Sequence, residues 1–259
     1  MLTSIYNFYK NAVEFIKDEI NYFLSDKPEK GLIESNLFLW TEHVFFSCLG
    51  YFLFRNDDWF YDITEMWDEN LNLKIGIYYT LYTIRYIVQS VMMTGEEKDY
   101  KSMMLHHIST ILLLTVSFIH YHRIGVIIAF SHDMVDLFFL PAKILHKSYE
   151  VRKIEILNIA SYIFFSVFFC VFFVTRIFLN SKIILHIIDE QVYRGGELIL
   201  FSENKRDIYT EGYSLLGLLF VNLGIQIYWQ ILIIKFAYNL SIGEKPKDEK
   251  GNEYFKKEH

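Results

Sequence analysis

Two adjacent histidines, His106 and His107, interrupt an apolar run that otherwise reads as lipid-facing sequence. Ionisable side chains are costly inside a bilayer, and where they occur they are usually paired or functional. Thr110 follows one helical turn later, so its hydroxyl would lie on the same face as the two imidazoles. Imidazoles placed in this way can exchange protons or attack a carbonyl carbon.

A second cluster, His132, Asp133 and Asp136, lies in the next apolar run, where the spacing would put an imidazole beside carboxylates on one helix face. The connection at residues 120–123 is so short that the two helices must be antiparallel neighbours. At about 1.5 Å per residue, the paired histidines lie roughly 6–8 Å and Asp136 about 9 Å inside the cytosolic ends of their helices. We therefore expect the two clusters to meet in the cytosolic half of a helical bundle.

Metal binding is the main alternative, because imidazole and carboxylate also suit zinc or iron. Membrane di-iron enzymes, however, carry more histidines in HxxxH and HxxHH repeats, and the sequence contains neither of these nor HExxH or GxSxG. We expect acid–base or nucleophilic chemistry by histidine, with no metal and no cofactor. The remaining internal histidines are expected to be ordinary hydrogen-bonding residues: His43, His120, His122, His146 and His186.

The composition predicts an all-α, polytopic membrane protein. Of the 259 residues, 53% are hydrophobic, which is too apolar for a soluble domain of this length, and several windows approach the roughly 20 residues that cross a bilayer. Residues 1–36 are expected to form a cytosolic amphipathic segment, and residues 241–259 a cytosolic tail. The domain between them, 37–240, has six expected spans, at about 37–54, 75–94, 103–121, 123–142, 159–179 and 213–234.

The distribution of charged residues along the chain indicates the membrane topology and does not indicate a nucleic-acid partner. Lys and Arg gather before the first expected span, between the second and third, after the fourth and after the sixth. These groups fall on one side if both termini are cytosolic. The acidic segment 55–74, the turn at 120–123 and a long loop at 180–212 then face the other compartment.

Polar side chains recur at helical spacing in several spans, which predicts that one face of each avoids lipid and lines a polar cavity. For the Asn and Gln side chains, the alternative to lining a cavity is hydrogen bonding between helices that holds the bundle together. Arg85 and Arg176 favour a polar cavity, because a guanidinium always carries charge and needs either a charged partner or water. The two stripes are Tyr78, Tyr82, Arg85 and Gln89 in the second span, and Asn222, Gln226 and Gln230 in the sixth.

Two segments of the chain closely resemble the Lag motif of ceramide synthases, which belong to the TLC (TRAM, LAG and CLN) superfamily. The resemblance is carried by "KDYKSMMLHHISTILLL" (98–114) and "RIGVIIAFSHDMVDLFFLPAKILHKSY" (123–149). Ser102 and Pro141 depart from positions that are usually acidic in the family, and the segment 117–123 is about one residue short. The homeobox-like insert and extra N-terminal span of many animal members are missing, so we expect the minimal six-helix core.

The resemblance implies transfer of a fatty acyl group from acyl-CoA to the amine of a long-chain sphingoid base, giving a (dihydro)ceramide. His106, or alternatively His107, would attack the thioester or remove the amine proton. His132, Asp133 and Asp136 would orient and charge-tune that imidazole. Residues expected to bind substrate are Thr110, Arg85, Tyr82, Asn222 and Gln226, with Lys98, Lys101 and Lys143 in a basic rim for coenzyme A phosphates.

The C-terminal "YFKKEH" is similar to a dilysine retrieval signal, with Lys256 and Lys257 fourth and third from the end. Together with the family resemblance, it predicts a multi-pass protein of the endoplasmic reticulum membrane. Three alternatives remain open: a non-enzymatic TLC protein, such as a translocon-associated or cargo- or lipid-sensing factor, another lipid acyltransferase, and a metal-dependent lipid hydroxylase. A homo- or hetero-dimer is also left open.

Overall fold

The computed structural model describes residues 28–66, 71–93, 100–189 and 205–242. Helices and short connections make up these four ranges, with no strand among them, so the all-α class is confirmed there. The expected N-terminal amphipathic segment falls mostly outside the described residues. Lys98 and the dilysine-like C-terminus also lie outside them.

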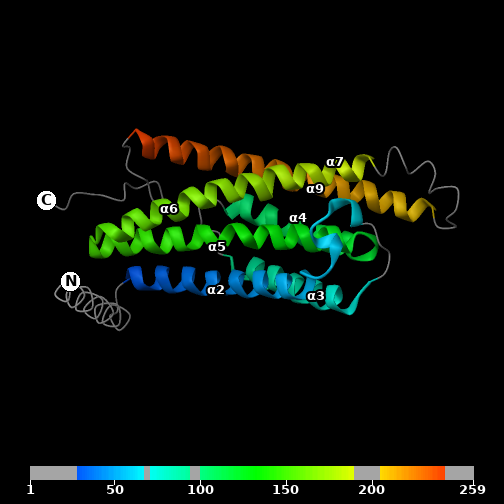
Figure 1. Ribbon diagram of the computed structural model, residues 1–259, viewed down its shortest axis with the longest axis horizontal. Helices are drawn as coiled ribbons and strands as arrows, with labels where there is room; N and C mark the ends of the chain where they lie inside the picture. The colour runs from blue at the N-terminus through cyan, green and yellow to red at the C-terminus, as the bar shows by residue number, and fades with distance from the viewer. Residues whose placement is uncertain (1–27, 67–70, 94–99, 190–204, 243–259) are drawn as a thin grey trace.

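The helices lie side by side along one long axis (Figure 1). Helix α5 lies at the centre and packs against α2 on one side and α6 on the other, whereas α4 packs against α3 and α9. The main elements are α2 (Pro28–Phe54), α3 (Leu73–Met92), α4 (Tyr100–His120), α5 (His122–Arg152), α6 (Glu155–Phe172), α7 (Asn180–Ile188) and α9 (Lys205–Ser241).

The two ends of the bundle differ in charge. The basic end holds the start of α2 and the ends of α5 and α9, with Lys143, Lys147, Arg152 and Lys153. The acidic end holds the end of α2 and the starts of α3 and α5, with Asp57, Asp58, Asp62 and Glu65. This grouping agrees with the expected loop positions, whereas the assignment of the basic end to the cytosol remains a prediction.

The turn between α4 and α5 is a single residue, Tyr121, whose backbone N–H donates to the Ser117 carbonyl at 2.9 Å. The expected antiparallel pair is therefore present. Close packing secures it: Tyr79 of α3 bonds both the Ser117 hydroxyl and the His122 carbonyl at 2.9 Å. A Cβ at Gly125 would overlap the Tyr79 hydroxyl, so only glycine fits at this crossing.

Pro141 lies inside α5 and leaves one backbone group without its helical partner. Proline has no N–H, so the carbonyl four residues earlier, that of Leu137, loses its intrahelical bond. The indole N–H of Trp40 in α2 donates to this carbonyl at 3.2 Å. A backbone acceptor freed by proline thus joins α2 to α5.

The fifth expected span is longer than the sequence indicates. Helix α6, a π-helical segment at Phe173–Leu179 (η3) and α7 form one helical rod from Glu155 to Ile188. The expected loop at 180–212 is therefore wrong for residues 180–188, which are helical and bury Ile183, Ile184 and Ile187. Those isoleucines make the first part of the expected loop part of the core. The expected loop is also wrong for residues 205–212, which form the first part of α9.

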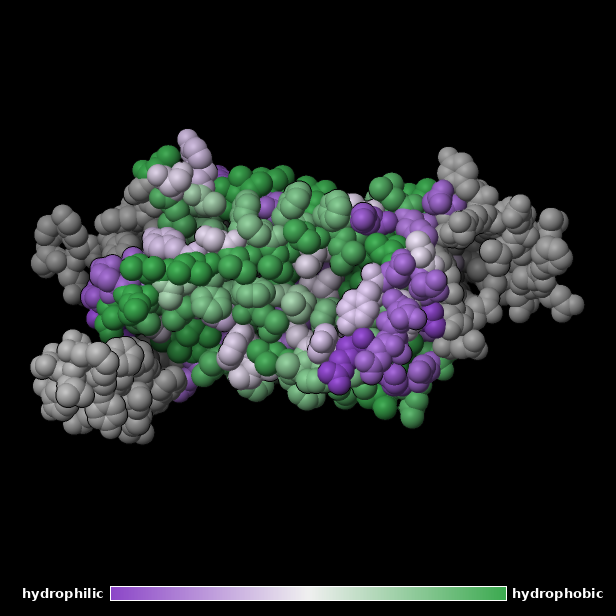
Figure 2. Space-filling model, viewed as in Figure 1, coloured by the Kyte–Doolittle hydropathy of each residue, from purple (hydrophilic) through white to green (hydrophobic). Residues whose placement is uncertain are grey.

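The outer surface is apolar around the middle of the bundle and polar at the acidic end (Figure 2). One stripe on α3 exposes Ile77, Leu81, Ile84, Val88 and Val91, a surface too extensive for a monomer in water. Among the described residues, four helices are long and apolar enough to cross a bilayer: Ile33–Phe54, His122–Arg152, Glu155–Ile188 and Gly212–Ser241. The chain is thus a multi-pass membrane protein, and spanning by α3 and α4 remains a prediction.

Two short 3-10 turns at the acidic end, η1 (Asp58–Phe60) and η2 (Ile63–Glu65), close the connection after α2. The backbone N–H and the hydroxyl of Thr64 both donate to the Asp62 carboxylate, at 2.9 and 2.8 Å. These two bonds lower the pKa of Asp62, because they stabilise its charged form. Trp59 packs inward against Phe54 of α2.

Candidate active site

The two predicted histidine clusters meet in the interior. The rings of His106 on α4 and His132 on α5 stack with centroids 5.5 Å apart and planes 10° apart. Both residues are buried, and Trp229 of α9 packs edge-on against His106 at 5.1 Å. Three helices therefore converge on this pair of imidazoles.

His107 is buried beside the pair but points toward α3. Its ring lies 5.0 Å from that of Tyr86, and its Nδ1 lies 3.1 Å from the Ser90 hydroxyl. The Ser90 hydroxyl donates its proton to the Tyr86 carbonyl at 2.6 Å, so it does not donate to His107 Nδ1 at the same time. His106 and His107 thus occupy different surroundings, although they are adjacent in sequence.

The hydrogen bonds of His132 define which ring nitrogen carries the proton. Its Nδ1 lies 2.6 Å from the Ile128 carbonyl, which can only accept, so Nδ1 bears the hydrogen. In the neutral ring Nε2 is then an acceptor, and the Gln226 amide nitrogen lies 3.4 Å from it. His132 is thereby held in one tautomer and one orientation.

The amides of α9 are oriented by a guanidinium. Arg176 donates to the Gln226 side-chain oxygen at 3.4 Å, and the Gln226 nitrogen donates to the Asn222 oxygen at 3.2 Å. Arg176 also donates to the His132 carbonyl at 2.8 Å. It comes from the π-helical segment η3, a departure from α-helical geometry that is common at functional sites.

Several buried polar atoms around His106 have no hydrogen-bond partner among the described residues: His106 Nδ1, Thr110 Oγ1 and Asn222 Nδ2. Helices α4 and α9 run antiparallel in Figure 1, and one turn along each leads from His106 to Thr110 and from Gln226 to Asn222. A buried polar group without a partner is unfavourable. These three atoms are therefore available to bond a substrate.

The carboxylates of α5 do not contact His106 or His107, which differs from the expected arrangement. Asp133 Oδ1 accepts from Arg85 Nη1 at 2.7 Å and lies 2.7 Å from His43 Nδ1. Asp136 lies 3.4 Å from Arg176 and 3.8 Å from His43. The reason is the α-helical turn: His132 and Asp133 are successive residues, so they face different neighbours, α4 and α9 for the histidine and α2 and α3 for the acid.

Two residues that contact Asp133 or Arg85 were not predicted to belong to the site. His43 was expected to be an ordinary hydrogen-bonding histidine, and Glu42 was not singled out. Glu42 lies 2.6 Å from Arg85 Nε and accepts from Gln89 at 3.1 Å. Both residues lie on α2, far from the motif in sequence, and only their place four and three residues before the buried Phe46 hinted at an inward face.

The other predicted substrate-binding residues have varied positions. Tyr82 is buried and donates to the Ala129 carbonyl at 2.8 Å, and its ring stacks on Tyr86. Lys101 is exposed at the start of α4, and Lys143 lies over the Phe139 ring at 5.3 Å. The structure thus places Tyr82 near the imidazoles and leaves the two lysines toward the basic end.

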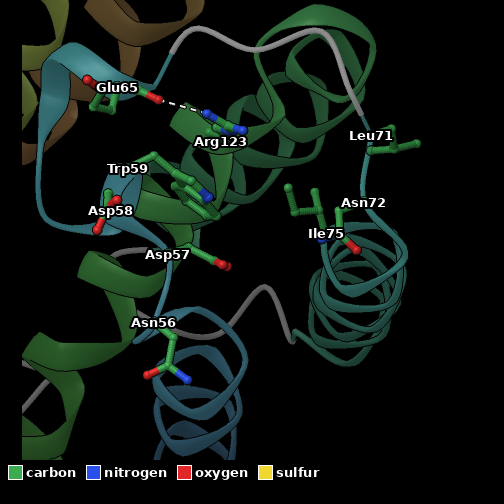
Figure 3. A pocket seen from close by; sticks show the side chains of 9 residues that line it. All are labelled: Asn56, Asp57, Asp58, Trp59, Glu65, Leu71, Asn72, Ile75 and Arg123. Carbon is green, nitrogen blue, oxygen red and sulfur yellow. Dashed lines mark hydrogen bonds between the residues drawn. The ribbon is translucent and has the colours of Figure 1, made fainter.

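A cavity of about 480 Å³ lies at the acidic end, away from the imidazoles (Figure 3). Asp57, Trp59 and Ile75 contribute to its wall, and Arg123 donates to the Glu65 carbonyl across it at 2.8 Å. The predicted polar interior is present as inward-facing side chains that largely bond one another. A cavity around the histidines remains a prediction.

The fold and these side chains define a class: a helical, multi-pass membrane protein with stacked histidines buried in its core and ion-paired carboxylates on α2 and α5. The TLC domain model matches residues 33–235, and the chain belongs to that family.

Relatives in the family carry names that agree with the motif. Ceramide synthase hyl-1 of Caenorhabditis elegans is 24% identical over 235 residues, covering 87% of this chain and 62% of the relative. Human ceramide synthase 5 is 25% identical (84% and 53%), and sphingosine N-acyltransferase lac1 of Schizosaccharomyces pombe is 23% identical (81% and 56%). The chain spans about half to three-fifths of the length of these relatives.

Proposed function

We propose that the protein is a ceramide synthase, which transfers a fatty acyl group from acyl-CoA to the amine of a long-chain sphingoid base. The observation that carries the proposal is the stacked pair His106 and His132, buried among polar atoms that have no partner in the described part of the chain. The names of the relatives support the same reaction class. The apolar surface suits substrates that reach the site through the bilayer.

The site has the groups that acyl transfer requires. A thioester is already activated, so the protein must supply a neutral amine, hold the acyl carbonyl and stabilise the oxyanion that develops on it. His106 Nδ1 has no partner among the residues that the structure describes, and it would accept the amine proton or attack the thioester carbon. Asn222 Nδ2 is a buried N–H donor suited to the oxyanion.

Both routes give the same balance. In direct transfer, the amine nitrogen bonds to the acyl carbon, the carbon–sulfur bond breaks, and His106 takes the amine proton while coenzyme A leaves as its thiolate. In the covalent route, His106 first bonds to the acyl carbon and coenzyme A leaves as its thiolate. The amine nitrogen then bonds to the acyl carbon, the bond from that carbon to the imidazole breaks, and the released imidazole takes the amine proton. His107 is the alternate residue for either role.

The basic end would receive the soluble part of acyl-CoA. Lys101 and Lys143 lie toward that end and would hold phosphate groups by charge-assisted hydrogen bonds, with Lys98 as a further candidate. This placement would leave the acyl chain in the bilayer and the thioester near the imidazoles. We propose the endoplasmic reticulum as the membrane, as expected from the dilysine-like C-terminus.

The test supplies purified protein in detergent or liposomes with palmitoyl-CoA and sphinganine and identifies products by mass spectrometry. The proposal predicts N-palmitoyl-sphinganine and free coenzyme A in equal amounts. A folded protein that forms no amide with any chain length of acyl-CoA would refute the synthase and favour a non-enzymatic TLC protein. A hydroxylated lipid together with stoichiometric metal would instead favour a hydroxylase.

A further inference from the structure

Charged side chains on α2, α3, α5 and η3 form a connected set, here called the charged network. It adjoins the stacked imidazoles, because Arg176 contacts both the His132 carbonyl and Asp136. Arg85 bridges α2 and α5 by contacting Glu42 at 2.6 Å and Asp133 at 2.7 Å. His43 lies 3.8 Å from Asp136, which contacts Arg176 at 3.4 Å. The charged network consists of Glu42, His43, Arg85, Asp133, Asp136 and Arg176.

The network has an uneven charge balance. In the part of the chain that the structure describes, its ion pairs involve three carboxylates and two guanidinium groups, so it carries one net negative charge when His43 is neutral. An uncompensated charge in a membrane interior is strongly unfavourable. One more cation would therefore be stabilised at this position.

The reachable members of the network are its more exposed side chains, which include His43, although the ring of His43 also lies 2.8 Å from Arg85 Nη2. Asp133 and Arg85 expose only 1% and 3% of their side-chain surface. His43 exposes 14% and Asp136 25%, and Asp136 is 3.4 Å from its guanidinium partner rather than 2.7 Å. A cation that approaches from outside would thus meet Asp136 and His43 first.

One buried acceptor adds to this attraction. The second oxygen of Asp133, Oδ2, is buried and has no hydrogen-bond partner among the described residues. An alkylammonium group carries three N–H donors, which matches a site that offers several acceptors and lacks one positive charge. A guanidinium or metal ion is less suited, because the entering group must come from the bilayer on an apolar chain.

We propose that the charged network is the subsite for the protonated amine of a long-chain base, held by the carboxylates of Asp136 and Asp133. This inference rests on the proposed function, because the amine is the acyl acceptor of that reaction. It divides the centre into two parts, with the acyl group handled by the imidazoles of α4 and the amine received between α2 and α5.

The proposal depends on charge, which allows it to be separated from a structural role of the same residues. H43Q keeps the net charge of the network and preserves a donor for Asp133. H43K brings the net charge to zero by adding a cation, and D136N brings it to zero by removing an anion with almost no change of shape. A structural role would make all three variants behave alike or follow their stability.

The experiment measures binding of radiolabelled sphinganine and of neutral N-acetylsphinganine to the detergent-solubilised full chain. Wild type and H43Q are expected to bind the amine more tightly than its acetylated form. H43K and D136N are expected to weaken sphinganine binding at least about tenfold, since a nearby like charge or a lost opposite charge shifts such equilibria by one or more pKa units. Binding of N-acetylsphinganine should be unchanged in all four proteins.

Three results would overturn the inference: equal affinity of the wild type for the two ligands, sphinganine binding by both H43K and D136N as tight as in the wild type, or parallel loss of both ligands by these variants when they remain folded. If one of the two variants does not fold, the other decides the question. Thermal unfolding in the same detergent reports folding. Failure of the proposed function would be distinct, because it is absence of amide product from the wild type with acyl-CoA.

Discussion

The imidazole rings of His106 and His132 stack in parallel, 5.5 Å between centroids, and join α4 to α5 in the core of the bundle. At this separation a positive charge on one ring disfavours a positive charge on the other. The Nδ1 proton of His132 is engaged by the Ile128 carbonyl, so His106 is the ring with an unengaged nitrogen. The stack thus gives the two histidines different roles: His132 supports, and His106 is available to react.

Removal of Arg85 should destabilise the protein strongly. R85M leaves Asp133 and Glu42 without their guanidinium partner, and breaking a buried ion pair in this way costs about 3–5 kcal/mol. The double variant R85M/D133N should be less destabilised than the sum of its single variants, because it removes one of the two carboxylate charges that R85M leaves without a partner. Thermal or denaturant unfolding in one detergent measures all three, and strict additivity would contradict the pairing.

The stability lost when the Trp40 hydrogen bond is removed should depend on Pro141, which frees the Leu137 carbonyl that accepts this bond. W40F removes the donor to the Leu137 carbonyl and is expected to lower the free energy of unfolding by about 1 kcal/mol. In a P141A background, the new N–H can bond the same carbonyl within the helix, so W40F should have a smaller effect there. An equal effect of W40F in both backgrounds, measured by unfolding, would show that the bond does not compensate for Pro141.

The crossing of α3 and α5 should not tolerate a methyl group at Gly125. G125A places a Cβ against the Tyr79 hydroxyl and the Ser117 hydroxyl, and overpacking of this kind costs about 1–3 kcal/mol. Gly76 provides a matched control, because a Cβ there meets nothing within 4 Å and G76A should be neutral or stabilising by up to about 1 kcal/mol. The melting temperatures of the two variants would then move in opposite directions or differ clearly; equal losses would argue against the close approach.

The two ends of the bundle should face different compartments. Single cysteines at Tyr61 of the acidic end and Ile154 of the basic end, in a chain with Cys48 and Cys170 replaced by alanine, test this with a membrane-impermeant maleimide on sealed microsomes. Cys at 154 should be labelled from the cytosolic side and Cys at 61 only after permeabilisation. Labelling of both from the same side would refute the helix arrangement, and the reversed pattern would refute the cytosolic assignment.

The sequence was sufficient for the central part of the site. Local spacing predicted that His106 and Thr110 share an inward face, and both are buried. The short connection at 120–123 correctly predicted that α4 and α5 are neighbours, and His106 and His132 meet between them. Helical periodicity also turned Asn222 and Gln226 inward. These features depend on contacts close in sequence or on strict periodicity, which a single chain reveals.

The contacts that the sequence did not reveal depend on packing between distant helices. The partners of Asp133 come from α2 and α3, and no spacing rule relates His43 or Arg85 to α5. The extension of the fifth span to Ile188 was missed because its polar residues, Asn180, Ser181 and Lys182, resemble a loop, although Asn180 is buried. The polarity of a short segment is a weak guide when a long helix continues through it.

The rate of amide formation by purified wild-type protein and by H106A, with palmitoyl-CoA and sphinganine at saturating concentrations, tests the central claim most directly. H186A, on α7 and outside the site, is the matched control for loss of an imidazole. The account predicts product from wild type and H186A and a loss of at least about 100-fold in folded H106A, the scale of a missing acid–base or nucleophilic group. Amide formation by H106A at the wild-type rate would contradict it.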